Sequence, residues 1–210
     1  MRHLFIEFAY HVAEYLNVWM QSENDYIFYE IYNEWAEYDE IADILLLQLE
    51  FFRTIKREFP ETIFHGIDIL VWQNPIGKFF LQYLENNNKQ DTEQYLLTLQ
   101  AIEQGEQYYQ SDFDFDFRVN MMTENFIRSF EKLNNENVMG IFGAFHTRLG
   151  YYIGTAQSTP ASEHEALPYI PTMAQRLKER YGDSLHTEDL SRFAWENWQG
   201  LPVTTGFMVD

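Results

Sequence analysis

The apolar residues of this 210-residue chain change their spacing several times along the sequence. Short, continuously apolar segments over 4–8, 62–70 and 138–142 are typical of buried strands. Between these segments, apolar residues recur every three to four positions, which is the period of an amphipathic helix. The alternation predicts an α/β fold that is rich in helix, with a central mixed, mostly parallel sheet flanked by helices.

The helical segments are bounded by recognisable start and stop signals. The sequence predicts helices over 10–20, 41–59, 76–84, 91–108, 117–133 and 172–181. Asp91 is expected to cap the fourth of these, Pro60 ends the second and Gly182 closes the last. The secondary structure of the tyrosine-rich, acidic stretch 26–37 is ambiguous. The stretch 151–171 is expected to be an irregular loop of the kind that often covers a binding site, and the last 25 residues are expected to hold one or two short strands.

Charge and composition exclude several classes of function. The 33 acidic and 14 basic residues give a net charge of −19, which opposes binding to nucleic acid or anionic lipid. The absence of cysteine excludes disulfides, thiolate metal sites and cysteine nucleophiles. No apolar stretch is long enough for a membrane span, so a cytoplasmic protein without membrane association is expected. The length allows one domain over 1–210 with its own core.

Ligands of open α/β sheets bind beyond the carboxyl ends of the strands, so polar residues at those ends are the candidate site. Glu7 ends the first predicted strand, Asp68 lies late in the second, and His146 follows the third. Arg118 and Asn125 fall on one helical stripe that must face the sheet. A carboxylate, an imidazole and a guanidinium in one crevice could activate water and stabilise an oxyanion. The alternative is structural: an ion pair between Glu7 and Arg118, and a hydrogen-bonded loop histidine.

An acidic stretch forms a second candidate. Asp112, Asp114 and Asp116 alternate with phenylalanine, which would place three carboxylates on one edge of an extended segment and could hold a hard cation. The favoured interpretation is that these acids lead into the N-terminus of the following helix, where negative charge is stabilising.

Two segments together resemble the signature of a known family. Residues 118–125 read RVNMMTEN, which fits R-x-x-x-M-x-E-N, and residues 138–146 read VMGIFGAFH, which ends in Gly-Ala-x-His. This pair resembles the helix and the strand with its histidine in erythromycin esterase-like proteins, within a broader grouping that includes the ChaN and TraB/Tiki proteins. Three further segments are compatible with that family: 4–7, 66–68 and 173–183.

The resemblance implies an α/β fold with a polar crevice that takes a small-molecule substrate. Some members hydrolyse esters such as macrolide lactones, some are metal-dependent proteases and others bind haem. For this chain it implies that Glu7 and His146 form an acid/base or metal-holding pair and that Arg118 orients the substrate or stabilises an oxyanion. A divalent metal is compatible with this set, and no other cofactor is expected. The remaining polar residues of the matching segments are expected to bind substrate: Asp68, Glu124 and Asn125.

The chain also departs from the family pattern. Gly143 stands where esterases of the family commonly carry a second histidine, and the family's opening G-E-x-x-H-G motif is not found. The domain is therefore expected to be incomplete at its N-terminus, with roughly 30 residues upstream that carry a first strand and helix. The alternatives are a catalytically degenerate member that binds a small molecule or a protein, and an unrelated acidic immunity-type binding protein. A homo-oligomer would be one way to cover an exposed sheet edge.

Overall fold

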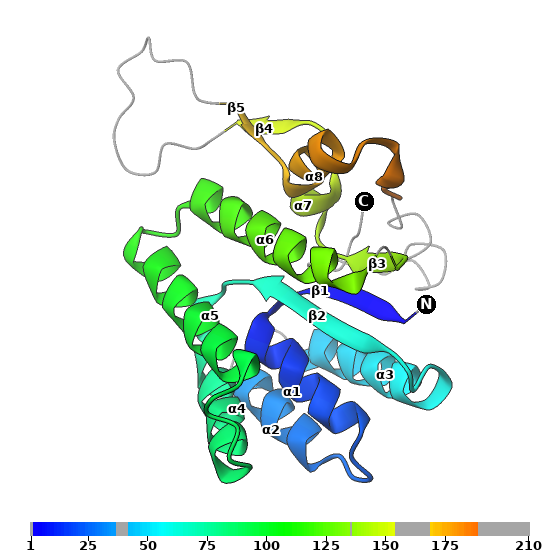
Figure 1. Cartoon of the computed structure of the whole chain (residues 1–210), viewed down its shortest axis with the longest axis vertical. Helices are drawn as coiled ribbons and strands as arrows, with labels where there is room; N and C mark the ends of the chain where they lie inside the picture. The colour runs from blue at the N-terminus through cyan, green and yellow to red at the C-terminus, as the bar shows by residue number, and fades with distance from the viewer. Residues whose placement is uncertain (1, 37–41, 135, 154–168, 189–210) are drawn as a thin grey trace. The chain divides into compact units, whose positions relative to one another are not determined.

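The computed structural model describes residues 2–36, 42–134, 136–153 and 169–188 (Figure 1). The chain divides into two compact units. The first comprises Met1–Phe113 and Asn125–Ile141, and the second comprises Asp114–Glu124 and Phe142–Asp210. Helix α6, Phe115–Phe130, contributes its first part to the second unit and its last part to the first.

A three-stranded parallel sheet forms the centre of the first unit. Its strands are β1 (His3–Ala9), β2 (Ile63–Asp68) and β3 (Val138–Ile141), in the order β2-β1-β3. The carboxyl ends of the three strands therefore lie at the same edge of the sheet. The predicted α/β class, with a parallel sheet flanked by helices, is confirmed.

Five helices of the first unit connect and cover these strands. They are α1 (Tyr10–Met20), α2 (Tyr26–Ala36), α3 (Ala42–Glu58), α4 (Asn74–Asn86) and α5 (Glu93–Gln110). Short 3₁₀ turns add η2 (Val71–Gln73) and η3 (Glu131–Leu133). The ambiguous tyrosine-rich stretch is a helix, α2. The predicted helices over 10–20 and 41–59 are confirmed to within a residue.

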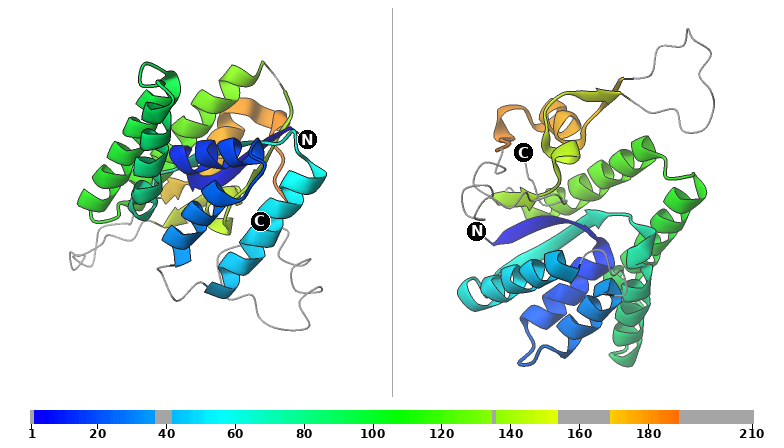
Figure 2. Two further views of the ribbon diagram at one scale, coloured as in Figure 1. Left: turned by 90° about the horizontal axis from the view of Figure 1, so that it is seen from below. Right: turned by 180° about the vertical axis from the view of Figure 1, so that it is seen from behind.

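Aromatic side chains fill the core on both faces of this sheet. Helices α1 and α3 cover the same face of the sheet (Figures 1 and 2). On this face, Phe52 of α3 meets Phe64 of β2 edge-on at 5.5 Å between ring centroids. On the other face, Phe5 packs against Phe126 from the end of α6 at 4.5 Å. Trp19 of α1 is completely buried. These contacts use much of the chain's aromatic content for packing, where such rings contribute strongly to stability.

The start of α5 differs from the prediction by one residue. Thr92, and not Asp91, is the N-cap, because its backbone is extended and its hydroxyl oxygen accepts the N–H of Tyr95 at 3.4 Å. Either side chain could cap a helix, and the choice depends on where the backbone leaves the extended conformation.

The acidic stretch before α6 is not extended. Asp112 and Phe113 have φ angles of 59° and 60°, which turn the chain between α5 and α6. The Asp114 carboxylate accepts the backbone N–H groups of Asp116 and Phe117 at 3.0 and 3.3 Å. The predicted edge of three carboxylates is therefore wrong, and the acidic lead into a helix N-terminus is confirmed.

The second unit contains short elements besides the first part of α6. They are α7 (Ala144–Thr147), β4 (Tyr151–Ile153), β5 (Tyr169–Pro171), α8 (Met173–Tyr181) and η4 (Gly182–Ser184). Strands β4 and β5 pair in antiparallel fashion, so the prediction of an irregular stretch over 151–171 is wrong at its two ends. Gly182 closes α8 with a φ of 60°, as predicted. Residues 154–168, and the predicted strands over 189–210, lie outside the described residues.

Arg176 of α8 links several segments of the second unit. Its guanidinium donates to the Asp116 carboxylate of α6 at 2.8 Å, to the Asn120 side chain and to the carbonyl of Pro171 at 3.1 Å. Such multidentate use of a guanidinium fixes the geometry of the groups it joins. None of the described helices has the length and apolarity to span a membrane.

Candidate functional site

Buried polar side chains gather where β1 and β2 end. Gln73 of η2 accepts the backbone N–H of Ala9, the last residue of β1, with its Oε1 at 2.6 Å. Asp68, the last residue of β2, is fully buried and its carboxylate accepts the N–H of Ile69 at 2.8 Å. We call this group the carboxyl-edge cluster. Its members, all in the first unit, are His11, Asp68, Gln73, Asn74, Gln104 and Asn125.

Glu7 lies in an irregular part of β1, two residues before Ala9, whose N–H is bound by Gln73 of this cluster. The regular pairing of β1 with β2 is interrupted between Ile6 and Ala9. A Cβ atom at Gly66 of β2 would lie 2.3 Å from the carbonyl oxygen of Ala9, so the strands approach each other here more closely than any other residue allows. Glu7 is half-buried. Irregularities of this kind are common next to active sites, where they redirect a side chain.

His11 presents an unprotonated nitrogen inside the cluster. The residue is completely buried, and its Nε2 lies 2.9 Å from the backbone carbonyl of Gln73. Because a carbonyl oxygen only accepts, Nε2 carries the proton and Nδ1 is an acceptor. Nδ1 has no hydrogen-bond partner among the described residues. Burial lowers the pKa of His11 to about 4, so the ring is neutral at pH 7.

Gln73 and Asn74 add two more polar atoms without partners. Since Gln73 Oε1 accepts from Ala9, its amide nitrogen is left as a donor, and this nitrogen has no acceptor among the described residues. The Asn74 amide donates to the carbonyl of Ile102 at 3.3 Å, and its oxygen has no donor there. A buried polar atom without a partner costs about 1–3 kcal/mol, and such atoms in folded proteins commonly bind water or a ligand.

His11, Gln73 and Asn74 are not among the site residues that the sequence predicts. The signal available was the polar pair Gln73-Asn74 placed shortly after a buried strand, where a ligand site is expected. His11 had no such signal, because its position on the buried side of α1 is typical of a core residue.

Both polar atoms of the Asn125 side chain form hydrogen bonds with protein groups. It is 3% exposed, and its amide nitrogen donates to the carbonyl of Ile67 at 3.0 Å and to Gln104 Oε1 at 3.1 Å. Its oxygen accepts from Arg128 at 2.9 Å. This pattern indicates that Asn125 ties the end of α6 to β2 and α5.

Asn125→Ala is expected to lower the free energy of unfolding by about 1–3 kcal/mol, because it leaves several buried groups without partners. Urea denaturation measures this change. Asn86→Ala is the matched control, since Asn86 is exposed at the end of α4 and its loss should change stability by less than about 0.5 kcal/mol. Equal effects of the two substitutions would contradict the structural role of Asn125.

Three predicted site residues belong to the second unit: Arg118, Glu124 and His146. Arg118 is half-buried on α6 and Glu124 is exposed there. His146, in α7, is 2% exposed, and its ring stacks on Phe115 of α6 with 5.7 Å between centroids. The second unit thus joins α7 to α6 through His146, while the first unit brings Asp68 and Asn125 into the carboxyl-edge cluster. The catalytic roles of Arg118 and His146 remain predictions from the sequence.

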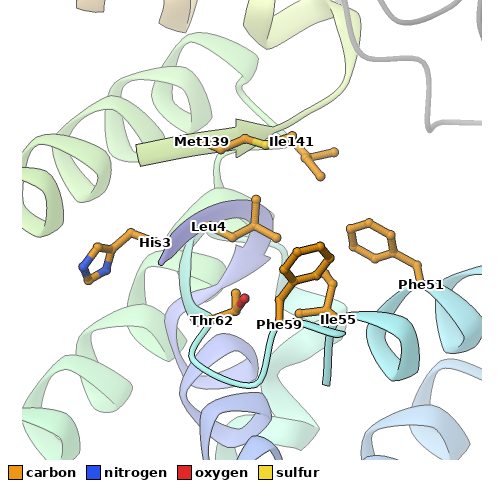
Figure 3. Close-up of a pocket in the computed structure, with 8 residues that line it drawn as sticks. All are labelled: His3, Leu4, Phe51, Ile55, Phe59, Thr62, Met139 and Ile141. Atoms are coloured by element: carbon orange, nitrogen blue, oxygen red, sulfur yellow. The ribbon is translucent and has the colours of Figure 1, made fainter. Parts of the chain in front are cut away.

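A separate pocket of about 230 Å³ lies between α3 and the sheet (Figure 3). It is mainly apolar, and the ring of His3 points away from it in Figure 3. The lining residues are His3, Leu4, Phe51, Ile55, Phe59, Thr62, Met139 and Ile141. Because it lacks converging polar groups, this pocket is less suited to chemistry than the carboxyl-edge cluster. The described residues also contain no group of three or more His, Cys, Asp or Glu side chains placed to hold a metal ion.

The fold and this site define a small α/β protein with a buried polar cluster at the carboxyl edge of a parallel sheet. No protein-family model, no curated protein and no solved structure matches the chain significantly. The resemblance to the erythromycin esterase-like proteins therefore remains a hypothesis that rests on residues 118–125 and 138–146.

Proposed function

We propose that this protein is a hydrolase of the erythromycin esterase-like kind, which cleaves an ester or a related bond of a small molecule with an activated water. The observation that carries the proposal is the carboxyl-edge cluster, with three buried polar atoms that lack protein partners. It lies where ligands of parallel α/β sheets bind. Two acceptors and one donor are the groups that would fix a water molecule and a polar substrate atom.

Glu7 is the proposed general base. A half-buried carboxylate at an irregular strand position can take a proton from water as the water attacks a carbonyl carbon. The amide nitrogen of Gln73 is a donor of the type that stabilises the oxyanion formed in that step. The neutral ring of His11 supplies an acceptor but is a weak base at pH 7. The sequence resemblance adds His146 as a second acid/base group and Arg118 as an orienting cation.

The second candidate is a binding protein that performs no catalysis. It is favoured by the neutrality of the three unpartnered atoms, which belong to two side-chain amides and an uncharged imidazole. Such a set recognises a neutral polar ligand by hydrogen bonds. The two candidates share the same site and differ in whether Glu7 performs chemistry.

Glu7→Gln is expected to lower kcat/KM at least roughly 100-fold in a panel of aryl esters and lactones, because the amide cannot accept the proton from water. Glu23→Gln is the matched control, since Glu23 is exposed in the turn after α1 and should leave the rate unchanged. His146→Ala in the same panel tests the role that the resemblance assigns to it.

The outcomes separate the two candidates. Turnover that survives Glu7→Gln would contradict the catalytic role of Glu7. A wild-type protein that shows no turnover but is stabilised thermally by one of the compounds would support the binding protein. Neither turnover nor stabilisation would contradict both.

A further inference from the structure

Two histidines and a glutamate are joined near the amino ends of the strands. His3 begins β1, His65 lies within β2, and Glu136 lies two residues before β3. His3 Nδ1 is 2.9 Å from His65 Nε2, and His3 Nε2 is 3.1 Å from Glu136 Oε2. We call these three residues the histidine clasp. It takes no part in the proposed hydrolysis and does not depend on it.

The hydrogen bonds of the clasp have a defined direction when both rings are neutral. The Glu136 carboxylate only accepts, so His3 Nε2 carries a proton and His3 Nδ1 is an acceptor. His65 must then donate from its Nε2 to His3 Nδ1. Each polar atom between the three side chains has a suitable partner in this state.

The clasp can accept one further proton but not two. A proton on His3 Nδ1 makes His3 a cation beside the Glu136 carboxylate, and His65 can turn from donor to acceptor through its other tautomer. If both rings are protonated, two N–H groups and two positive charges face each other across 2.9 Å. His3 is 4% exposed, so water screens this repulsion poorly.

Nothing around the rings offsets a second charge. Glu136 is the one charged group that contacts either ring among the described residues. The other ring neighbour is Phe5 of β1, which stacks on His65 at 4.6 Å between centroids. From α6, Phe126 contacts Phe5, and α3 presents only apolar side chains to the pocket beside His3. Burial and the neighbouring His3 lower the pKa of His65 to about 4.

Strand β3 is the element that depends most on this clasp. It pairs only with β1 within the described sheet, and only over the four residues Val138–Ile141. Met139 and Gly140 are exposed. A short edge strand with few buried side chains opens locally at low cost in free energy.

We propose that the histidine clasp is a pH-sensitive switch that holds the start of β3 against β1 at neutral pH and releases it in acid. Protonation of the second ring breaks the bond between the histidines, which weakens the attachment of Glu136 to β1. The released element is β3, while α1 and the centre of the sheet stay folded.

Hydrogen exchange of backbone amides tests this switch. We expect the protection factors of 138–141, corrected for intrinsic rates, to fall at least roughly tenfold between about pH 7 and pH 4.5. In His65→Phe, which keeps a ring on Phe5, this fall in the protection of 138–141 should largely disappear. Glu136→Gln removes the counter-charge of protonated His3, so acid should release β3 more steeply. His186→Gln is the control, because His186 is exposed and belongs to the second unit.

Two results would overturn the switch: protection of 138–141 that does not fall in acid, or a fall in His65→Phe as large as that in the wild type. If His65→Phe fails to fold, the ¹⁵N shifts of the wild-type histidines decide instead. Nε2–H tautomers for both His3 and His65 at about pH 7, with loss of their mutual hydrogen bond in acid, support the switch. Unchanged tautomers and an intact bond in acid contradict it.

Discussion

Gly66→Ala is expected to lower the free energy of unfolding by about 3 kcal/mol. The added Cβ would lie 2.3 Å from the carbonyl oxygen of Ala9 and 2.8 Å from that of Phe8. Both contacts are with backbone, which cannot rotate away as a side chain would. Strands β1 and β2 must therefore separate at the buried carboxyl end of β2. Urea denaturation monitored by tryptophan fluorescence measures the loss.

A second glycine separates this steric effect from the conformational effect of adding a methyl group. Gly182 has a φ of 60°, and a Cβ there would meet nothing within 4 Å. With a ψ of −133°, Gly182 adopts a backbone conformation that is almost exclusive to glycine, so Gly182→Ala should cost about 1–3 kcal/mol for conformational reasons alone. If Gly66→Ala costs less than about 1 kcal/mol, the close approach of β1 and β2 is not what fixes glycine at position 66.

The local pattern of the sequence predicts much of this fold. Helix α1 and strands β1 and β2 lie within one or two residues of their predicted positions, because each is coded by a short run of apolar residues with one period. Strands β4 and β5 show no such pattern. Each has three residues, and their pairing joins Tyr151 to Pro171 across a long stretch of chain. Contacts of this range leave no periodic signal within either segment.

The sequence likewise predicts one part of the candidate site and not the other. Asp68 and Glu7 were predicted near the carboxyl ends of strands, since the rule depends only on where a strand ends. The free nitrogen of His11 could not be predicted, because it arises when η2 brings the carbonyl of Gln73 to the other nitrogen of the ring. Similarly, Asn125 lies on the predicted helical stripe, but only the tertiary contacts show that its amide is used by Ile67 and Gln104.

Acid is expected to destabilise the protein through His11. A histidine with a lower pKa in the folded state than in the unfolded state binds its proton more tightly when the chain is unfolded. Its contribution to stability is therefore complete above the unfolded pKa of 6.5 and declines as the pH falls to the folded value of about 4. A difference of this size corresponds to about 3 kcal/mol for the completely buried ring. The free energy of unfolding, measured in urea across this pH range, should fall by at least that amount.

His11→Gln isolates this contribution, because glutamine does not titrate and its amide can still donate to the carbonyl of Gln73. We expect the variant to be less stable than the wild type at pH 7 but to lose about 3 kcal/mol less between pH 6.5 and 4. The free energy of unfolding of His186→Gln should fall in acid as much as that of the wild type, since the His186 side chain is 84% exposed. The remaining acid dependence of His11→Gln should disappear largely when His65 is also replaced, since His65 is the other histidine whose pKa is lowered to about 4. If the free energy of unfolding of His11→Gln fell in acid as steeply as that of the wild type, His11 would not be buried as a neutral ring. The carboxyl-edge cluster would then lack the acceptor that Nδ1 of His11 provides.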